Sequence, residues 1–144
     1  MMKQVCVLGG SGFVGSAIVR QLSLAGYSVN VLTRKREASK HLILLANVAV
    51  LECDVMDDAS LKQALKGSDV VINLIGVLHN SKKASFKAMH AELPKRVAAL
   101  CVKLGIKRLL HMSALQASQQ APSQYLKSRL KVSKPYCDRR KAWL

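Results

Sequence analysis

The sequence has few acidic residues, few aromatic residues and no long apolar run. Eight Asp and Glu stand against 23 Lys and Arg, so the formal charge is +15, and an anionic partner such as a nucleic acid or a membrane surface must be considered. Aromatic residues make up only 4% of the sequence, so few side chains are available to stack on bases. We therefore rank nucleic-acid binding lowest among the functions considered. No stretch reaches the ~18 apolar residues of a membrane span, and the N-terminal apolar run is too short for a secretory signal. We therefore expect a soluble, cytoplasmic protein.

The four cysteines lack the spacing of a disulfide framework or a zinc site. They are far apart, without a C-x-x-C pair, and three of the four, Cys6, Cys53 and Cys101 but not Cys137, lie in apolar runs. A reduced thiol in such a run packs as a small hydrophobe. The four histidines show no metal-ligand spacing either. We expect a reducing compartment and no metal.

The apolar residues that are present, 50% of 144, suffice for the core of one domain. Five apolar segments alternate with helical patterns and predict strands; they cover residues 4–10, 27–34, 48–55, 69–78 and 107–115. Such alternation indicates an α/β fold, a Rossmann-type doubly wound parallel sheet of about five strands in the order 3-2-1-4-5. No linker or repeat divides residues 1–128. Residues 129–144 are a basic tail with neither helical nor strand periodicity beyond Leu130.

A glycine-rich loop follows the first predicted strand. In "GGSGFVG", Gly10, Gly12 and Gly15 satisfy G-x-G-x-x-G, and Gly9, Gly12 and Gly15 satisfy the variant G-x-x-G-x-x-G. Glycine permits a tight turn, close approach of the backbone to a pyrophosphate, and close packing of the next helix. The anion then meets free N–H groups at the positive end of the helix dipole. The loop predicts dinucleotide binding.

The second predicted strand ends in "VLTRKR", without the acidic residue that meets the ribose of NAD. Arg34 is suited to the 2′-phosphate of NADP because a guanidinium pairs well with phosphate oxygens. Lys35 stands beside it as a second basic residue. The strand end therefore favours NADP over NAD. The alternative is a solvated basic loop.

Four stretches together resemble the extended and atypical short-chain dehydrogenase/reductases: "VCVLGGSGFVGSAIVRQL", "CDVMDDASLKQALKGSDVVINLIG", "RLLHMSALQA" and "YLKSR". The chain looks most like NAD(P)-dependent epimerase/dehydratase-like members, in particular those similar to the nucleotide-binding accessory subunit of respiratory complex I. The resemblance implies that Arg34 meets the adenosine phosphate. It also implies that the pyrophosphate is surrounded by Gly9, Gly12, Phe13 and Val14. The adenine is then bordered by Asp54 and Val55, and the cofactor cleft is lined by Leu74, Ile75 and Gly76.

Catalysing members of this family use a Ser or Thr together with Y-x-x-x-K. The resemblance puts Ser113 at the hydroxyl position and Tyr125 at the general-acid position, but Arg129 stands where the lysine belongs. A guanidinium stays charged yet is wider than an ammonium, which puts hydride transfer in doubt. The alternative reading is a surface tyrosine. A non-catalytic assembly or regulatory subunit that keeps the dinucleotide as a structural element is the competing function.

The resemblance ends at about residue 128, and family members continue with a further strand and a substrate region. Deleting one base from a coding of "SKAEGEQA", typical of the family after the tyrosine, yields "SRLKVSKP", which is Ser128 to Pro135 here. We therefore hypothesise that residues 129–144 are translated out of frame and poorly ordered, which sequencing through codon 129 would test. An incomplete flank of the sheet would favour a homodimer.

Overall fold

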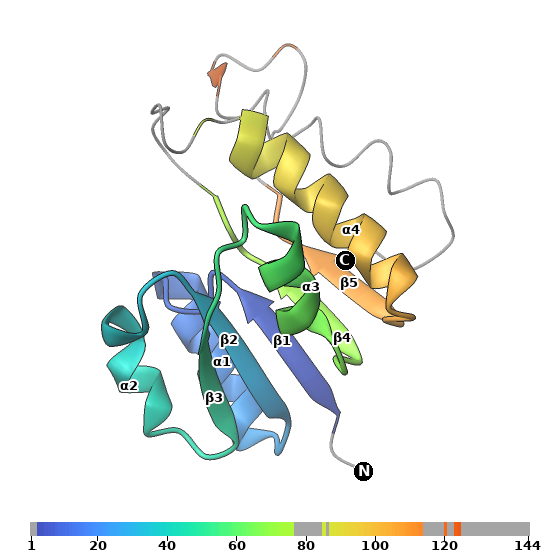
Figure 1. Cartoon of the computed structure of the whole chain (residues 1–144). Helices are drawn as coiled ribbons and strands as arrows, with labels where there is room; N and C mark the ends of the chain where they lie inside the picture. The colour runs from blue at the N-terminus through green and yellow to red at the C-terminus, as the bar shows by residue number, and fades with distance from the viewer. Residues whose placement is uncertain (1–2, 77–84, 86, 114–119, 121–122, 125–144) are drawn as a thin grey trace.

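The computed structural model describes residues 3–76, 85, 87–113, 120 and 123–124. Within them lies a parallel sheet (Figure 1) made of β1 (Gln4–Leu8), β2 (Ser28–Thr33), β3 (Val48–Glu52), β4 (Val70–Asn73) and β5 (Arg108–His111). The order β3-β2-β1-β4-β5 confirms the predicted Rossmann-type arrangement. Tyr125, Arg129 and the tail of residues 129–144 lie outside the described residues.

Helices cover both faces of this sheet, as continuously apolar parallel strands require. They are α1 (Phe13–Leu24), the 3₁₀ turn η1 (Arg36–Ser39), α2 (Lys40–Ile43), α3 (Asp58–Leu65), the π-helical turn η2 (Ala88–Glu92) and α4 (Leu93–Lys103). In Figure 1, α1 lies behind the sheet and α3 and α4 lie in front of it. The result is a three-layer sandwich with an apolar core on each side of the sheet.

Local signals set several helix ends as expected. Asp57 caps α3, its carboxylate accepting a hydrogen bond from the Ser60 N–H at 2.9 Å, which satisfies a free donor of the first turn. After α1, the Tyr27 N–H donates to the Leu22 carbonyl at 3.0 Å, and Gly26 N–H donates to Ser23 at 3.0 Å. This pair is the Schellman pattern that a C-terminal glycine produces. Each helix therefore stops where the chain must turn back into the sheet.

Pro94 stands in the first turn of α4, directly after the π-helical turn. Because proline has no N–H, the normal helical bond from residue 94 to the His90 carbonyl cannot form. The Leu93 N–H instead reaches back five residues to the Ala88 carbonyl, which is the π-helical bond. Pro94 therefore stands where the regular α-helix begins.

The front core contains three buried, unpaired cysteines. Cys6, Cys53 and Cys101 belong to one apolar cluster with Leu61 and Leu65 of α3. Burial raises the pKa of the Cys6 thiol to about 12 and that of Cys101 to about 11. These thiols stay protonated at neutral pH and pack as hydrophobes, as predicted; Cys137 lies outside the described residues.

The strand register brings the loops that follow the strands to one edge of the sheet. Leu8 of β1 aligns with Leu32 of β2 and with Asn73 of β4, and Leu32 aligns with Leu51 of β3. From β1 the chain adds β2 and β3 on one side, and it then crosses back to add β4 and β5 on the other side of β1. Open α/β sheets bind ligands at such a switch point. The glycine loop after β1 lies at this place.

No helix in the part of the chain that the structure describes is long and apolar enough to cross a lipid bilayer.

Candidate dinucleotide-binding site

The glycine loop after β1 folds back on itself before α1 begins. Gly9 has φ +78°, a left-handed conformation that residues with a Cβ rarely adopt. Its carbonyl accepts a hydrogen bond from the Gly12 N–H at 3.3 Å, and the Gly12 carbonyl accepts the first helical bond, from Ser16, at 2.8 Å. Gly12 is thus the N-cap residue of α1, and the loop delivers the start of the helix to the carboxyl edge of the sheet.

Two of the loop glycines are required by packing within the protein. A Cβ on Gly15 would collide with the Gly9 carbonyl oxygen and would lie 2.7 Å from the Cα of Gly10. A Cβ on Gly10 would lie 2.9 Å from a methyl group of Val31. Both distances are shorter than carbon contacts allow, so these positions let α1 press directly against β1 and its loop.

Gly12 differs, because no described residue around it requires a glycine there. Its φ of −73° is open to any residue. Among the described residues, a Cβ on Gly12 would meet only the Gly9 carbonyl oxygen within 4 Å, at an ordinary 3.5 Å. These residues therefore leave room at Gly12 for a ligand, and close approach to a pyrophosphate is the reason the motif supplies.

The first turn of α1 is open to an anion. Its N-cap residue has no side chain to accept a hydrogen bond from the helix, and no acidic residue lies in the first turn. Phe13 is 96% exposed and Val14 is 44% exposed, an unusual placement for large apolar side chains. An N-terminal turn with free N–H groups and the positive end of the helix dipole suits a phosphate. The residues present therefore fit the pyrophosphate of a dinucleotide.

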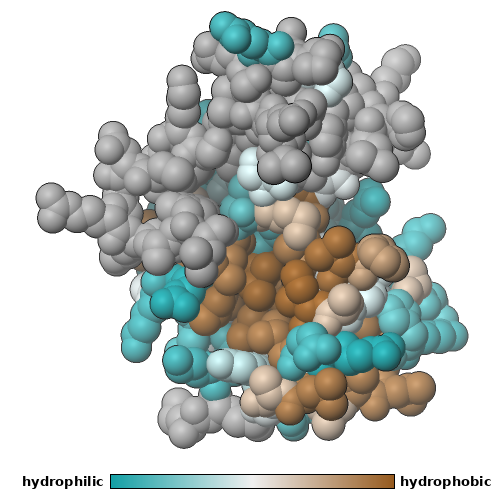
Figure 2. All heavy atoms as spheres, turned by 180° about the vertical axis from the view of Figure 1, so that it is seen from behind, coloured by the Kyte–Doolittle hydropathy of each residue, from teal (hydrophilic) through white to brown (hydrophobic). Residues whose placement is uncertain are grey.

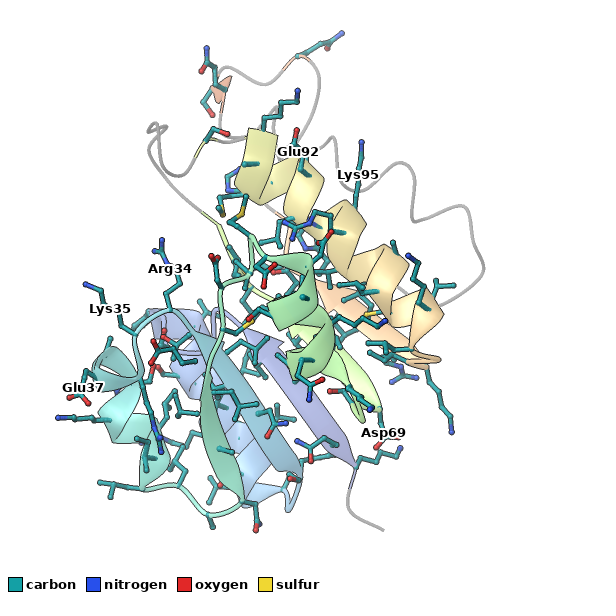
Figure 3. The ribbon with its side chains drawn as sticks, viewed as in Figure 1. Arg34, Lys35, Glu37, Asp69, Glu92 and Lys95 are labelled. Carbon is teal, nitrogen blue, oxygen red and sulfur yellow. The ribbon has the colours of Figure 1, made fainter. Side chains whose placement is uncertain are left out.

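The loop after β2 holds two basic side chains outside the sheet. The Thr33 hydroxyl accepts from the Lys35 N–H at 3.2 Å and donates to the Lys35 carbonyl at 3.1 Å, so the strand ends in a tight local turn. Figure 3 shows Arg34 and Lys35 pointing away from the sheet at the end of β2. Both are exposed and available to an anion at this edge.

The loop after β3 runs beside the loop after β2. The Cys53 N–H donates to the Thr33 carbonyl at 2.9 Å, and the carboxylate of Asp54 accepts from the Met56 N–H at 2.9 Å. Asp54 is exposed, whereas Val55 is 7% exposed and packs in the front core. Its side chain therefore packs within the protein, so Val55 can contact a ligand only through its backbone.

The loop after β4 contacts the glycine loop directly. A Cβ on Gly9 would lie 3.1 Å from the backbone of Leu74 and Ile75, and the Asn73 carboxamide oxygen accepts from the Ile75 N–H at 3.1 Å. Gly76, next in the chain, is exposed. Gly9, Leu74 and Ile75 therefore meet at this edge of the sheet.

On the far side of β4, Asn73 also lies 3.2 Å from the Nδ1 atom of His111 in β5, amide nitrogen to ring nitrogen. Because an amide nitrogen can only donate, Nδ1 is the acceptor in this contact. Ser113 follows two residues later and is exposed. Its predicted partners Tyr125 and Arg129 lie outside the described residues.

Three contacts near this edge are not signalled by any local sequence pattern. The Ser16 hydroxyl on α1 lies 3.1 Å from His41 Nε2 on α2. Arg96 on α4 reaches the carboxylate of Asp58 and the carbonyl of Met56. The partners are 25 to 40 residues apart in the chain, so only the folded arrangement brings them together. No group of three His, Cys, Asp or Glu side chains among the described residues is arranged to hold a metal ion.

A glycine loop that leads into an uncapped helix at the switch point is typical of a dinucleotide site. Residues 5–137 match a protein family described as the "NAD dependent epimerase/dehydratase family". The chain belongs to this family. Family membership makes the chain an NAD(P)-binding domain of the short-chain dehydrogenase/reductase type, as the sequence predicts. It decides neither between NAD and NADP nor what the residues around the cofactor do.

Known members of the epimerase/dehydratase family resemble the chain at moderate identity. The NADH dehydrogenase [ubiquinone] 1 alpha subcomplex subunit 9, mitochondrial, of Mus musculus is 32% identical over 85% of this chain and 34% of its own length. The subunit of the same name from Arabidopsis thaliana is 34% identical over 85% of this chain and 32% of its own length. The chain thus spans about a third of the length of these relatives.

Among solved structures, MoeE5 in complex with UDP-glucose and NAD superposes on 90% of this chain and 46% of its own, with a TM-score of 0.72 and 20% identity. This likeness confirms the fold of the epimerase/dehydratase domain. At such identity it says nothing of the ligand.

Proposed function

We propose that the protein binds NADP in preference to NAD, with the pyrophosphate on the first turn of α1 and the 2′-phosphate at Arg34. The observation that carries dinucleotide binding is Gly12, an exposed glycine that neither backbone conformation nor packing requires. Arg34 supports the choice of NADP, because it is exposed at the end of β2, where no carboxylate stands to meet the ribose. Lys35 adds a second positive charge in the same turn.

The remaining positions have distinct roles in this proposal. Phe13 and Val14 contribute N–H groups and cover the pyrophosphate, and Asp54 and the backbone of Val55 border the adenine. Leu74, Ile75 and Gly76 line the cleft toward the nicotinamide. Their placement at one edge of the sheet supports these roles, because loops after parallel strands meet there.

Titration calorimetry with NADPH and NADH, each to millimolar concentration, tests the proposal. Binding should also raise the melting temperature by mass action. We expect NADPH to bind about tenfold more tightly, the free energy of one good charged hydrogen bond, and Arg34→Ala to remove that difference while leaving NADH unchanged. No heat and no thermal shift with either dinucleotide would refute the proposal.

For chemistry, we propose that Tyr125 exchanges a proton with a substrate oxygen while Ser113 hydrogen-bonds that oxygen. The bound nicotinamide supplies the hydride acceptor or donor. Ser113 is exposed just beyond β5 at the carboxyl edge, which supports its role. We infer inefficient turnover, because Arg129 cannot act as the point charge that lowers the pKa of the tyrosine.

Consumption of NADPH with a panel of aldehydes and ketones measures this turnover. We expect little consumption by the natural chain and more by Arg129→Lys, with equal cofactor affinity. Rapid turnover by the natural chain would show that the arginine is an effective partner.

A second function is supported by the relatives rather than by the site. The mouse and Arabidopsis proteins are named as subunits of NADH dehydrogenase, and the chain is similar to about a third of their length. As an accessory subunit, the protein would hold its dinucleotide without turning it over. Co-purification with a membrane respiratory complex would favour this function, whereas a free cytoplasmic protein in cell fractionation would favour the first.

We also propose that the chain forms a homodimer through its rear face. Figure 2 shows a broad apolar surface there, and the half-buried residues around the rear core include Ile18, Val70, Leu74 and Leu110. Apolar patches of this kind commonly mark contact surfaces. Light scattering after gel filtration should give a dimer, and Leu110→Glu should give a monomer. A monomer for the natural chain at high concentration would contradict the proposal.

A further inference from the structure

Arg96 on α4 makes three contacts with the segment that follows β3. Its Nε donates to an Asp58 carboxylate oxygen at 2.7 Å, and one terminal nitrogen lies 2.6 Å from the same oxygen. That nitrogen also donates to the Met56 carbonyl at 3.0 Å. One guanidinium thus bonds both the start of α3 and the loop before it. The planar fork of arginine can do this, whereas the single nitrogen of lysine cannot.

Met56 is held through both of its backbone polar groups, which belong to two successive peptide units. The Met56 carbonyl receives the bond from Arg96, and the Met56 N–H donates to the carboxylate of Asp54 at 2.9 Å. Asp54 lies in the segment that runs beside the turn of Arg34, because Cys53 donates to the Thr33 carbonyl. These hydrogen bonds and the short backbone between them therefore join α4 to the edge of the site where the adenosine would lie.

Arg96 is less exposed than the lysines of its helix. Its side chain is 25% exposed, whereas Lys95 and Lys103 are exposed. Together with Lys103, it lines a shallow groove of about 280 Å³ between α3 and α4. Lys95 points away from α3 in Figure 3. Asp58 is 73% exposed, so its ion pair with Arg96 adds little stability by itself. The bond to the Met56 carbonyl, a backbone atom, is the contact with a structural consequence.

We propose that Arg96 is a positioning residue for the adenosine half of the dinucleotide. It holds the backbone of Met56 in place. Through Met56 it also keeps the Asp54 carboxylate and the Val55 backbone in the arrangement that receives the adenine and its ribose. Without Arg96 the segment keeps its attachment to the core through Val55 but loses the bond that fixes the next peptide. The inference rests on the proposed dinucleotide binding and names a residue outside the loops that carry the family's cofactor motif.

The test compares Arg96→Met with Lys95→Met, which removes the same charge from the same turn of α4 without a bond to the loop. Two quantities are measured: the affinity for adenosine 2′,5′-bisphosphate, a fragment with only the adenosine half, and amide hydrogen exchange of residues 54–58 without ligand. For Arg96→Met we expect about tenfold weaker fragment binding, the loss of one charged hydrogen bond, and faster exchange. Lys95→Met should match the natural protein in both.

Arg96→Lys is the second variant, because it keeps the charge and most of the packing if Arg96→Met does not fold. We expect it to bind the fragment about threefold more weakly, since an ammonium replaces only part of the fork. Natural fragment affinity in either Arg96 variant, or equal losses in Lys95→Met, would overturn the inference. The proposed function fails separately, if the natural protein binds neither NADPH nor the fragment.

Discussion

The two sides of the carboxyl edge are built differently. On the proposed adenosine side, a backbone hydrogen bond joins the segment after β3 to the end of β2, and Arg96 joins that segment to α4. On the proposed reaction side, the described residues supply Asn73, His111 and the exposed Ser113, and the proposed proton donor stands further along the chain. In our proposal, binding of the dinucleotide is therefore a property of the sheet and its first loops, whereas chemistry depends on residues after β5.

The same contrast exists within the glycine loop, between residues three apart. Gly15 is required by packing within the protein, whereas Gly12 is the position that we propose serves the ligand. A motif of this kind combines a folding requirement with a binding requirement, and substitutions can separate the two.

The largest effect is expected for Gly15→Val. Its Cβ would collide with the backbone of Gly9 and Gly10, which cannot move without displacing α1 from the sheet. We expect a loss of about 3 kcal/mol or more in the free energy of unfolding, measured by urea denaturation, or a chain that does not fold. Natural stability in this variant would show that α1 has another way to pack and would remove the distinction from Gly12.

Gly12→Val should leave the fold intact and weaken the ligand. The backbone conformation and the free space admit a side chain, so the urea midpoint should change little. The added methyl groups would occupy the place of the pyrophosphate, and we expect about a hundredfold loss in NADPH affinity by calorimetry, in line with the strong effects of misplacing a bound group by about 1 Å. Unchanged affinity would mean that the phosphates bind elsewhere.

A pH series examines the core beneath the adenosine side. The folded protein holds Cys6 protonated to about pH 12, whereas the ordinary value is 9.0. Above pH 9 the unfolded chain releases this proton and the folded chain does not, so stability that is complete below pH 9 falls as the pH rises toward 12. By pH 10 we expect a loss of about 1 kcal/mol from this thiol.

Cys6→Ala is the control for the pH series. It should have a lower stability at pH 7 but a shallower decline between pH 9 and 10, measured by urea denaturation in matched buffers. An identical decline in the natural protein and in Cys6→Ala would assign the pH dependence to other groups.

The smallest effect is expected for Ser113→Ala on binding. Because Ser113 lies on the reaction side and is exposed, NADPH affinity should stay within about twofold, as for a surface substitution that removes no buried partner. Any turnover that the natural chain shows should fall. A clear loss of NADPH affinity would extend the binding region to the end of β5 and weaken the division between the two sides.

Periodicity and capping residues predicted the elements well, and their ends less well. Of the fourth apolar run, the described residues 69–76 form a strand only from Val70 to Asn73, because the Asn73 side chain bonds the Ile75 N–H and the chain turns there. Apolarity alone does not show where a strand stops pairing, since Leu74 and Ile75 beyond its end are apolar as well.

The candidate site was predicted in the same uneven way. The spacing of the glycines in the loop after β1 identified Gly9, Gly12 and Gly15, because a phosphate site needs backbone positions close together in the chain. The end of the second predicted strand identified Arg34. The burial of Val55 could not be read from its neighbours, nor could the contacts of Arg96 with residues about 40 positions away. A side chain that acts across such a distance has no local signature.

The alternation of apolar strands with capped helices was enough to establish the sheet, its order and the location of the dinucleotide loop, because each depends on short-range pattern and on the handedness of crossovers. Which glycine the packing requires, and which arginine bonds the segment after β3, depended on distances between segments far apart in the chain. Such distances follow from the packing of α1 and α4 on the sheet, which residue order alone does not contain.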